Sequence, residues 1–325
     1  MKKESIKNIT ILNTMSGCIT ISIELELGWG MHDKCKYGHL SKDRTAETEA
    51  LDNLLHLTDK YNIPLTFDVV GHLFHEDCDG EHTGPHPSRW WNEDPGSNQQ
   101  SDPLFYAPDL ISEIRSQEVE HEIATHTYSH LLADDLPSNT LDDELEKVRN
   151  LHSSFDLSPP TSIVMPRHQA PDYSVLSDHG INVIRKPIEG YSQSDLNPFC
   201  KFWWILTRRH PESTLQQNQG ILETTATPHP SLTSQILPTG QSSAHPAFSV
   251  IPLKLRQFIH KRYLIDTIDR AVQNDSHVHL WTHVYNMANG AQWPPLQAGL
   301  SYLGKQIKKD MIDISVMRDL RYKDP

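Results

Sequence analysis

The chain has 325 residues, a length that a single α/β barrel domain commonly fills and that allows one large shared core. It carries 42 acidic against 29 basic side chains, for a formal net charge of -13, so a surface that tracks a polyphosphate backbone would oppose the overall field. We therefore expect one domain over residues 1–325 and no nucleic-acid partner.

The four cysteines are widely spaced and contain no C-x-x-C pair: they are Cys18, Cys35, Cys78 and Cys200. They are too few to staple a chain of this size, which favours a reducing compartment. The first residues lack the long apolar core of a secretory signal, and no apolar run approaches membrane-spanning length. The sequence therefore predicts a soluble, cytoplasmic protein with no membrane span, of unspecified oligomeric state.

The first predicted element is a strand. Apolar and polar residues alternate strictly from Ile19 to Leu27, which places Glu24 and Glu26 together on the polar face. Such a face is also what a half-exposed edge strand shows, so the two glutamates have a purely structural alternative.

Further along, predicted strands alternate with predicted helices. The expected strands are residues 65–70, 122–124, 162–165, 181–184 and 278–281. The expected helices are residues 45–61, 109–117, 141–155, 174–179 and 253–273. A βαβα order implies a parallel sheet, and six or seven such units in one domain imply a barrel.

Two segments interrupt this order. Residues 71–103 form a loop insertion rich in Gly, Pro, Asp, His and Trp, and loops of that length are usually functional or disordered. Trp90 and Trp91 within it favour an ordered loop. Residues 187–249 are rich in Pro, Ser and Thr, with one apolar block at 202–206, and are expected to be irregular.

The stretch Glu122-Ile-Ala-Thr-His126-Thr-Tyr-Ser-His130 places two imidazoles four residues apart after a short apolar run. Two neutral histidines at that spacing can reach one divalent ion, and Glu24 or Glu26 would supply the carboxylate that they lack. The alternative is two ordinary polar residues in the first turn of a helix.

In parallel α/β barrels, functional side chains follow the carboxyl ends of the strands. That rule places four strand ends of this chain at one opening of the barrel, called the mouth below. The side chains that follow these strand ends are Glu24 and Glu26, His126 and His130, Arg167, and His283. Alone, Arg167 would be a salt-bridging surface residue and His283 a satisfied core histidine. Their joint placement favours a metal-assisted hydrolase.

The order Glu24-Leu-Glu26, His126-Thr-Tyr-Ser-His130, Met165-Pro-Arg167 and Leu280-Trp-Thr-His283 resembles the ordered motifs of the NodB-type polysaccharide deacetylases, carbohydrate esterase family 4. The resemblance spans roughly residues 18–290. It implies a distorted (β/α)7 barrel and a hydrolase that removes N-acetyl groups from a glycan or amino-sugar substrate. It also implies one divalent metal ion, with Zn expected and Co, Mn or Ni as alternatives.

The resemblance assigns roles by position. Glu26, His126 and His130 match the family's metal ligands. Glu24 matches the general base, Arg167 the arginine that orients this base, and His283 the general acid. The family motif has adjacent aspartates, whereas Leu25 separates two glutamates here, so Glu24 and Glu26 could exchange roles or both could bind metal.

Substrate contacts are expected from Trp29 and Trp281, which lie near strand ends and would stack on a sugar, and from Asn286. For the two tryptophans the alternative is a place in the core.

The insertion also gathers potential metal ligands, namely His72, His75, Cys78, Asp79, His82 and His86. Their spacing matches no standard zinc module. A polar loop that covers the cleft is therefore favoured over a second metal site.

Two other functions fit the same motifs. Some relatives of these deacetylases hydrolyse other C–N bonds, including those of cyclic ureides, sometimes without a metal. Alternatively, the two glutamates could have silenced the site and left a glycan-binding or assembly component. The sequence does not specify the sugar, its linkage or whether the substrate is a polymer or a lipid- or nucleotide-linked precursor, although a cytoplasmic location would favour a precursor.

Overall fold

The computed structural model describes residues 17–132, 137–188 and 210–322. The features predicted for the first residues of the chain, for Cys200 and for the apolar block at 202–206 lie outside these ranges. No helix of the described residues is long and apolar enough to cross a membrane.

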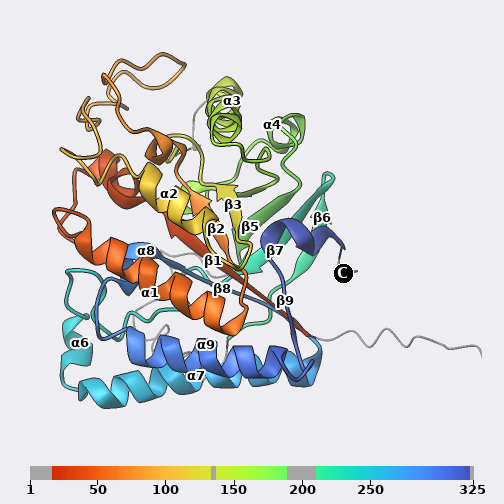
Figure 1. Cartoon of the computed structure of the whole chain (residues 1–325). Helices are drawn as coiled ribbons and strands as arrows, with labels where there is room; N and C mark the ends of the chain where they lie inside the picture. The colour runs from red at the N-terminus through yellow and green to blue at the C-terminus, as the bar shows by residue number, and fades with distance from the viewer. Residues whose placement is uncertain (1–16, 133–136, 189–209, 323–325) are drawn as a thin grey trace, which may run out of the picture.

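A nine-stranded sheet forms the centre of the molecule, in the order β6-β7-β5-β4-β3-β2-β1-β8, with β9 paired to β1 (Figure 1). The strands are β1 (Cys18–Leu25), β2 (Thr66–Val69), β3 (Glu122–Thr125), β4 (Ser162–Val164), β5 (Val183–Pro187), β6 (Leu215–Asn218), β7 (Ile221–Ala226), β8 (His277–His283) and β9 (Asp313–Ile314). Among the described residues every strand pair is parallel except β6 with β7. The predicted α/β fold with a parallel sheet is confirmed.

The two ends of the parallel series, β7 and β8, meet through side chains. Thr224 Oγ1 on β7 lies 3.2 Å from His277 Nε2 and 3.1 Å from His279 Nδ1 on β8. This contact brings the sheet round on itself, so that the side chains on its inner face point into a barrel interior.

Helices lie around the sheet (Figure 1). The α-helices are α1 (Thr45–Tyr61), α2 (Pro108–Arg115), α3 (Ser138–Ser154), α4 (Tyr173–Asp178), α6 (Pro246–Ser249), α7 (Leu253–Asn274), α8 (Val284–Met287) and α9 (Trp293–Ile307). Short 3-10 helices are η1 (Leu27–Lys34), η2 (Gly71–Phe74), η3 (Pro166–His168) and η4 (Met317–Tyr322). Helix α1 has the predicted bounds, because Asn62 ends it in the left-handed region with φ 53°.

Strand β1 shows how the polar interior arises. All eight of its residues are buried. Its apolar residues belong to the main core, together with Leu51 and Leu54 of α1. Its polar residues face inward, where Ser22 Oγ lies 2.9 Å from His279 Nε2 and accepts a hydrogen bond from Arg185 of the distant strand β5. Glu24 is therefore not on the exposed face of an edge strand.

The irregular region predicted at 187–249 is irregular only in part. Strands β6 and β7 form a hairpin whose turn residues Gln219 and Gly220 have φ 50° and 85°. Both central residues of a type I′ turn need positive φ, and Gln-Gly is a weaker signal for it than Asn-Gly. Helix α9 was also not predicted.

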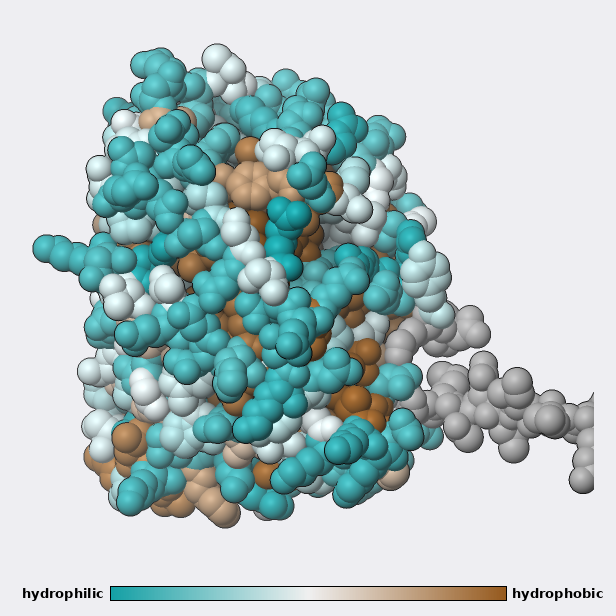
Figure 2. Space-filling model, in the orientation of Figure 1, coloured by the Kyte–Doolittle hydropathy of each residue, from teal (hydrophilic) through white to brown (hydrophobic). Residues whose placement is uncertain are grey.

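The face shown in Figure 2 is largely hydrophilic. Large exposed apolar side chains occur at the junction of α6 and α7, namely Val250, Leu253, Leu255 and Phe258.

Candidate active site

Strand β1 delivers Glu24, and the turn after it delivers Glu26. The strand ends at Leu25, and Glu26 has φ −121° and ψ −24°, outside the extended region. The prediction that both glutamates lie on one strand face is therefore wrong for Glu26. The turn folds its carboxylate over Gly30, where a Cβ would lie 2.3 Å from Glu26 Cδ. Glycine at this position leaves room for the carboxylate.

Glu26, His126 and His130 form a compact buried group. His130 Nε2 lies 3.2 Å and His126 Nε2 3.6 Å from Glu26 Oε2. The three ligand atoms lie within 4.8 Å of one another. Two imidazoles and one carboxylate are the protein ligands of many catalytic zinc centres, which leave further coordination positions open.

The segment that carries the two histidines is a strained turn and not a helix. Thr127 and His130 have φ 63° and 58°, a region that costs a non-glycine residue about 1–3 kcal/mol. The surroundings fix this turn, because Gly71 N donates to the Thr127 carbonyl at 2.9 Å and Leu131 N to Thr127 Oγ1 at 2.7 Å. The helical alternative for His126 and His130 is therefore wrong.

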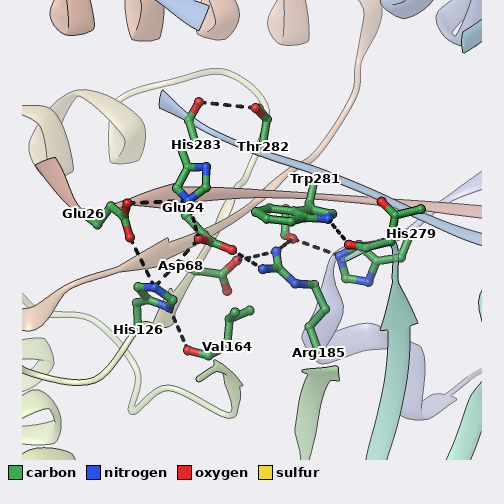
Figure 3. Close-up of polar contacts among 12 residues, drawn as sticks. Glu24, Glu26, Asp68, His126, Val164, Arg185, His279, Trp281, Thr282 and His283 are labelled. Atoms are coloured by element: carbon green, nitrogen blue, oxygen red, sulfur yellow. Dashed lines mark hydrogen bonds and ion pairs between the residues drawn. The ribbon is translucent and has the colours of Figure 1, made fainter. Parts of the chain in front are cut away.

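The state of His126 tests whether these residues fit a metal ion. Its Nδ1 lies 2.7 Å from the carbonyl oxygen of Val164 and donates to it, which leaves the Nε2 lone pair directed at the two glutamates (Figure 3). This buried Nε2 has no hydrogen-bond partner among the described residues. A divalent cation would satisfy it and offset the charge of Glu26, so the residues fit the predicted metal.

Glu24 has different neighbours. Its Oε2 lies 3.0 Å from His283 Nε2 and 3.8 Å from His126 Nε2, and its Oε1 accepts a hydrogen bond from Arg185 Nη2 (Figure 3). Burial alone would raise the pKa of Glu24, but Arg185 and His283 outweigh it and hold this pKa well below its usual range. Glu24 is thus an ionised carboxylate beside the group of possible ligands, in a position that suits a base.

His283 ends strand β8 between the two carboxylates. Its Nε2 lies 3.0 Å from Glu24 Oε2 and 3.5 Å from Glu26 Oε1. Burial alone would lower the pKa of His283, but Glu24 and Glu26 outweigh it and raise this pKa above its ordinary value. Asn286 Nδ2 lies 3.0 Å from His283 Nδ1, which leaves the proton on Nε2.

Arg185 makes the contact that was expected of Arg167. Arg185 on β5 is fully buried, bonds Glu24, and donates to Ser22 Oγ at 2.6 Å. Arg167 instead reaches Asp33 Oδ1 at 2.5 Å on the exposed side of the mouth. The expectation that Arg167 orients Glu24 is therefore contradicted by the contacts, because η3 turns its side chain outward.

Asp68 on β2 is a further buried group that was not predicted. Arg185 Nη1 lies 3.7 Å from its Oδ2, and neither carboxylate oxygen has a hydrogen-bond partner among the described residues. Burial raises the pKa of Asp68 well above its usual value, although Arg185 acts in the opposite direction. Asp68 interrupts a short apolar strand, and this is the sequence signal that could have found it, whereas Arg185 stands at the end of an apolar run.

A pocket of about 240 Å³ adjoins His283 and is lined by Trp281, Tyr285 and Asn286 and by residues of the loop 230–239. Trp281 is only 2% exposed, and Arg185 lies 4.4 Å from its ring centre. Asn286 thus lines the pocket and also fixes His283.

Trp29 is fully buried, and its indole N–H donates a hydrogen bond to the Phe105 carbonyl oxygen. This burial contradicts the prediction that Trp29 stacks on a sugar.

The fold and the site define an α/β barrel with a carboxylate–histidine centre at the carboxyl ends of its strands. Residues 32–184 match the family model described as polysaccharide deacetylase. The matched family is the one that the motifs of the chain resemble. No curated protein matches the chain.

Solved structures with the same fold cover nearly the whole chain. A protein from Mycobacterium smegmatis assigned to the polysaccharide deacetylases has a TM-score of 0.59 and 12% identity, over 95% of this chain and 91% of its own. One from Pseudomonas aeruginosa PAO1 has a TM-score of 0.54 and 10% identity, over 94% and 89%. Puue allantoinase has a TM-score of 0.55 and 11% identity, over 95% and 91%. These likenesses confirm the predicted NodB-type barrel fold.

Proposed function

We propose that the chain is a metal-dependent hydrolase that removes N-acetyl groups from a glycan or amino-sugar substrate. The observation that carries this proposal is the convergence of Glu26, His126 and His130 on one buried point, with Glu24 and His283 beside it. The match of residues 32–184 to the polysaccharide deacetylase family model supports the same reaction.

Glu26, His126 and His130 would hold the ion. A divalent ion bound there polarises the amide carbonyl and lowers the pKa of water. Zinc suits two imidazoles and a carboxylate, and Co, Mn or Ni would also be accepted.

Glu24 and His283 move the protons. Glu24 Oε2 accepts a proton from the attacking water, since Arg185 holds the other carboxylate oxygen and keeps the group ionised. His283 Nε2 donates a proton to the amide nitrogen as the C–N bond breaks. The products are acetate and the free amino sugar, so that water supplies the atoms that the two fragments gain.

Arg185 and Asn286 act as positioning residues. Arg185 fixes Glu24 from inside the barrel, and Asn286 fixes the imidazole of His283 through Nδ1. The first contact is buried and the second is partly buried, so the two proton-transfer groups are oriented before a substrate arrives.

The test measures acetate release by the full chain from N-acetylglucosamine and its oligomers with Zn, Co, Mn and Ni supplied in turn. Wild type should release acetate, and His126→Ala should not. The control is His179→Ala, which removes a histidine paired with Asp142 away from the site. Equal rates in wild type and His126→Ala, or sugar binding without turnover under every metal, would rule out the proposal.

Hydrolysis of another C–N bond is a second candidate. The observation that favours it is that the fold matches Puue allantoinase, with a TM-score of 0.55, about as well as it matches the Pseudomonas aeruginosa protein, with a TM-score of 0.54. The same base and acid could open a cyclic ureide, with no acetate formed. A parallel assay of ring opening and ammonia release on ureides separates the two reactions.

A further inference from the structure

The loop insertion at 71–103 brings four potential metal ligands together away from the candidate active site. They are His72, Cys78, His82 and Asp94, and their ligand atoms lie within 4.8 Å of one another. The side chains of His72 and Asp94 are fully buried and that of His82 is nearly so. Of the insertion residues singled out in the sequence, His75 and His86 turn elsewhere, to Tyr128 and Glu144.

Two of the spacings among these atoms suit a tetrahedral ion. Zn–S and Zn–N bonds of about 2.3 and 2.05 Å at a tetrahedral angle put sulfur and nitrogen about 3.6 Å apart, and nitrogen and oxygen about 3.4 Å apart. Cys78 Sγ lies 3.6 Å from His82 Nε2, and His72 Nε2 lies 3.3 Å from Asp94 Oδ2. His82 Nε2 is hydrogen-bonded directly to Asp94 Oδ2, and an ion bound between the two side chains would replace this contact.

Hydrogen bonds with residues outside the cluster orient three of the four ligands. His72 Nδ1 lies 3.4 Å from the Phe105 carbonyl oxygen and donates to it, which turns the Nε2 lone pair toward the cluster. That buried Nε2 has no hydrogen-bond partner among the described residues. Tyr106 donates to Asp94 Oδ1 at 2.7 Å and leaves Oδ2 facing the histidines, while Gly80 N lies 3.4 Å from Cys78 Sγ.

We propose that His72, Cys78, His82 and Asp94 bind a second divalent metal ion, and that this ion is structural. Thiolate and imidazole ligands select zinc among the common divalent ions. Four protein ligands complete a tetrahedral shell, whereas the three ligands at Glu26 leave positions open. The second ion therefore holds the insertion in place and does not act on substrate.

The position of the cluster gives this ion a role at the active site. The His72 ring lies 4.4 Å from the ring of Trp29, three residues after Glu26, and the His82 ring stacks on Trp91 at 4.0 Å. Trp90, next to Trp91, donates to Ser129 Oγ at 2.7 Å, between His126 and His130. Loss of the second ion would loosen both segments that carry the first set of ligands.

Cobalt substitution provides the test, because a thiolate ligand gives Co²⁺ a near-ultraviolet charge-transfer band and the group at Glu26 contains no sulfur. Full-length wild type loaded with Co²⁺ should show this band. His126→Ala should keep it, so the result does not depend on the proposed function. Cys78→Ser should lose it, and Cys35→Ser, which changes an exposed thiol, should keep it.

Metal content gives a second readout. Zinc-loaded Cys78→Ser and His82→Gln should each retain one ion per chain fewer than wild type after gel filtration, and Cys35→Ser should match wild type. Absence of the band from folded, cobalt-loaded wild type would overturn the proposal, and this measurement requires no variant to fold. An unchanged band or zinc content in Cys78→Ser would overturn it as well.

Discussion

Replacement of Arg185 by methionine tests the polar interior that supports Glu24. The buried guanidinium contacts Glu24, donates to Ser22 at 2.6 Å and lies 3.7 Å from Asp68. Methionine keeps much of the length and apolar contact of the side chain but removes the charge. Arg185→Met therefore leaves two buried carboxyl groups without their shared cation.

The expected cost follows from this burial. Removal of one partner from a buried ion pair typically costs about 3–5 kcal/mol, because the remaining charge is left uncompensated. Arg167 forms the matched control, since its pair with Asp33 has side chains that are 32% and 19% exposed. Partly exposed pairs of this kind are worth about 0–1 kcal/mol, so Arg167→Met should be close to neutral.

The pH dependence of the stability that Arg185 contributes has a definite sign. Arg185 helps to hold the pKa of Glu24 below its unfolded value, so its contribution to stability is present above about pH 4.5 and is lost as the pH falls through the folded pKa. The difference between wild type and Arg185→Met should accordingly be largest at neutral pH and shrink in acid.

Urea unfolding of the metal-free proteins across pH measures these differences, and acetate release reports on Glu24. Arg185→Met should lose most activity at neutral pH and regain part of it at higher pH, because the pKa of Glu24 rises without its cation. A cost below about 1 kcal/mol for Arg185→Met would refute the reasoning. An equal loss of activity in Arg167→Met would restore the role expected from the family motif.

Two further substitutions probe the same site. Burial raises the pKa of Asp68, so the folded protein holds a proton that the unfolded chain releases above about pH 4, and stability falls as the pH rises. Asp68→Asn should therefore be more stable than wild type at about pH 8 but not at about pH 4, as measured by urea unfolding. An equal difference in stability at the two pH values would contradict a raised pKa for Asp68. Gly30→Ala puts a Cβ 2.3 Å from Glu26 Cδ. Calorimetry should show that this variant binds a divalent metal ion about 10–100-fold more weakly than wild type, with unchanged thermal stability. An affinity equal to that of wild type would mean that Glu26 is not a ligand.

Local signals in the sequence predicted much of the fold. The helix predicted at 45–61 has the bounds of α1, and the strands predicted at 122–124 and 162–165 lie within one residue of β3 and β4. The family motifs brought Glu24, His126 and His283 to one mouth, where the structure also places them. These features depend on neighbours in the chain and on one rule for parallel strands.

The parts that were missed depend on contacts between distant segments. The predicted strand at 181–184 stopped one residue before Arg185, because a charged residue reads as the end of an apolar run when its partner Glu24 is 161 positions away. Asp94 completes the second metal cluster, yet it follows His82 by 12 residues, outside any standard ligand spacing. Only the folded loop brings these side chains together.

The central claim is that Glu26 is a metal ligand and that Glu24 is the base. Zinc affinity and acetate release should be measured side by side for Glu26→Gln and Glu24→Gln. The account predicts that Glu26→Gln loses both one bound ion and activity, while Glu24→Gln keeps the ion and loses acetate release. Loss of the ion from Glu24→Gln, with metal and turnover retained in Glu26→Gln, would contradict it.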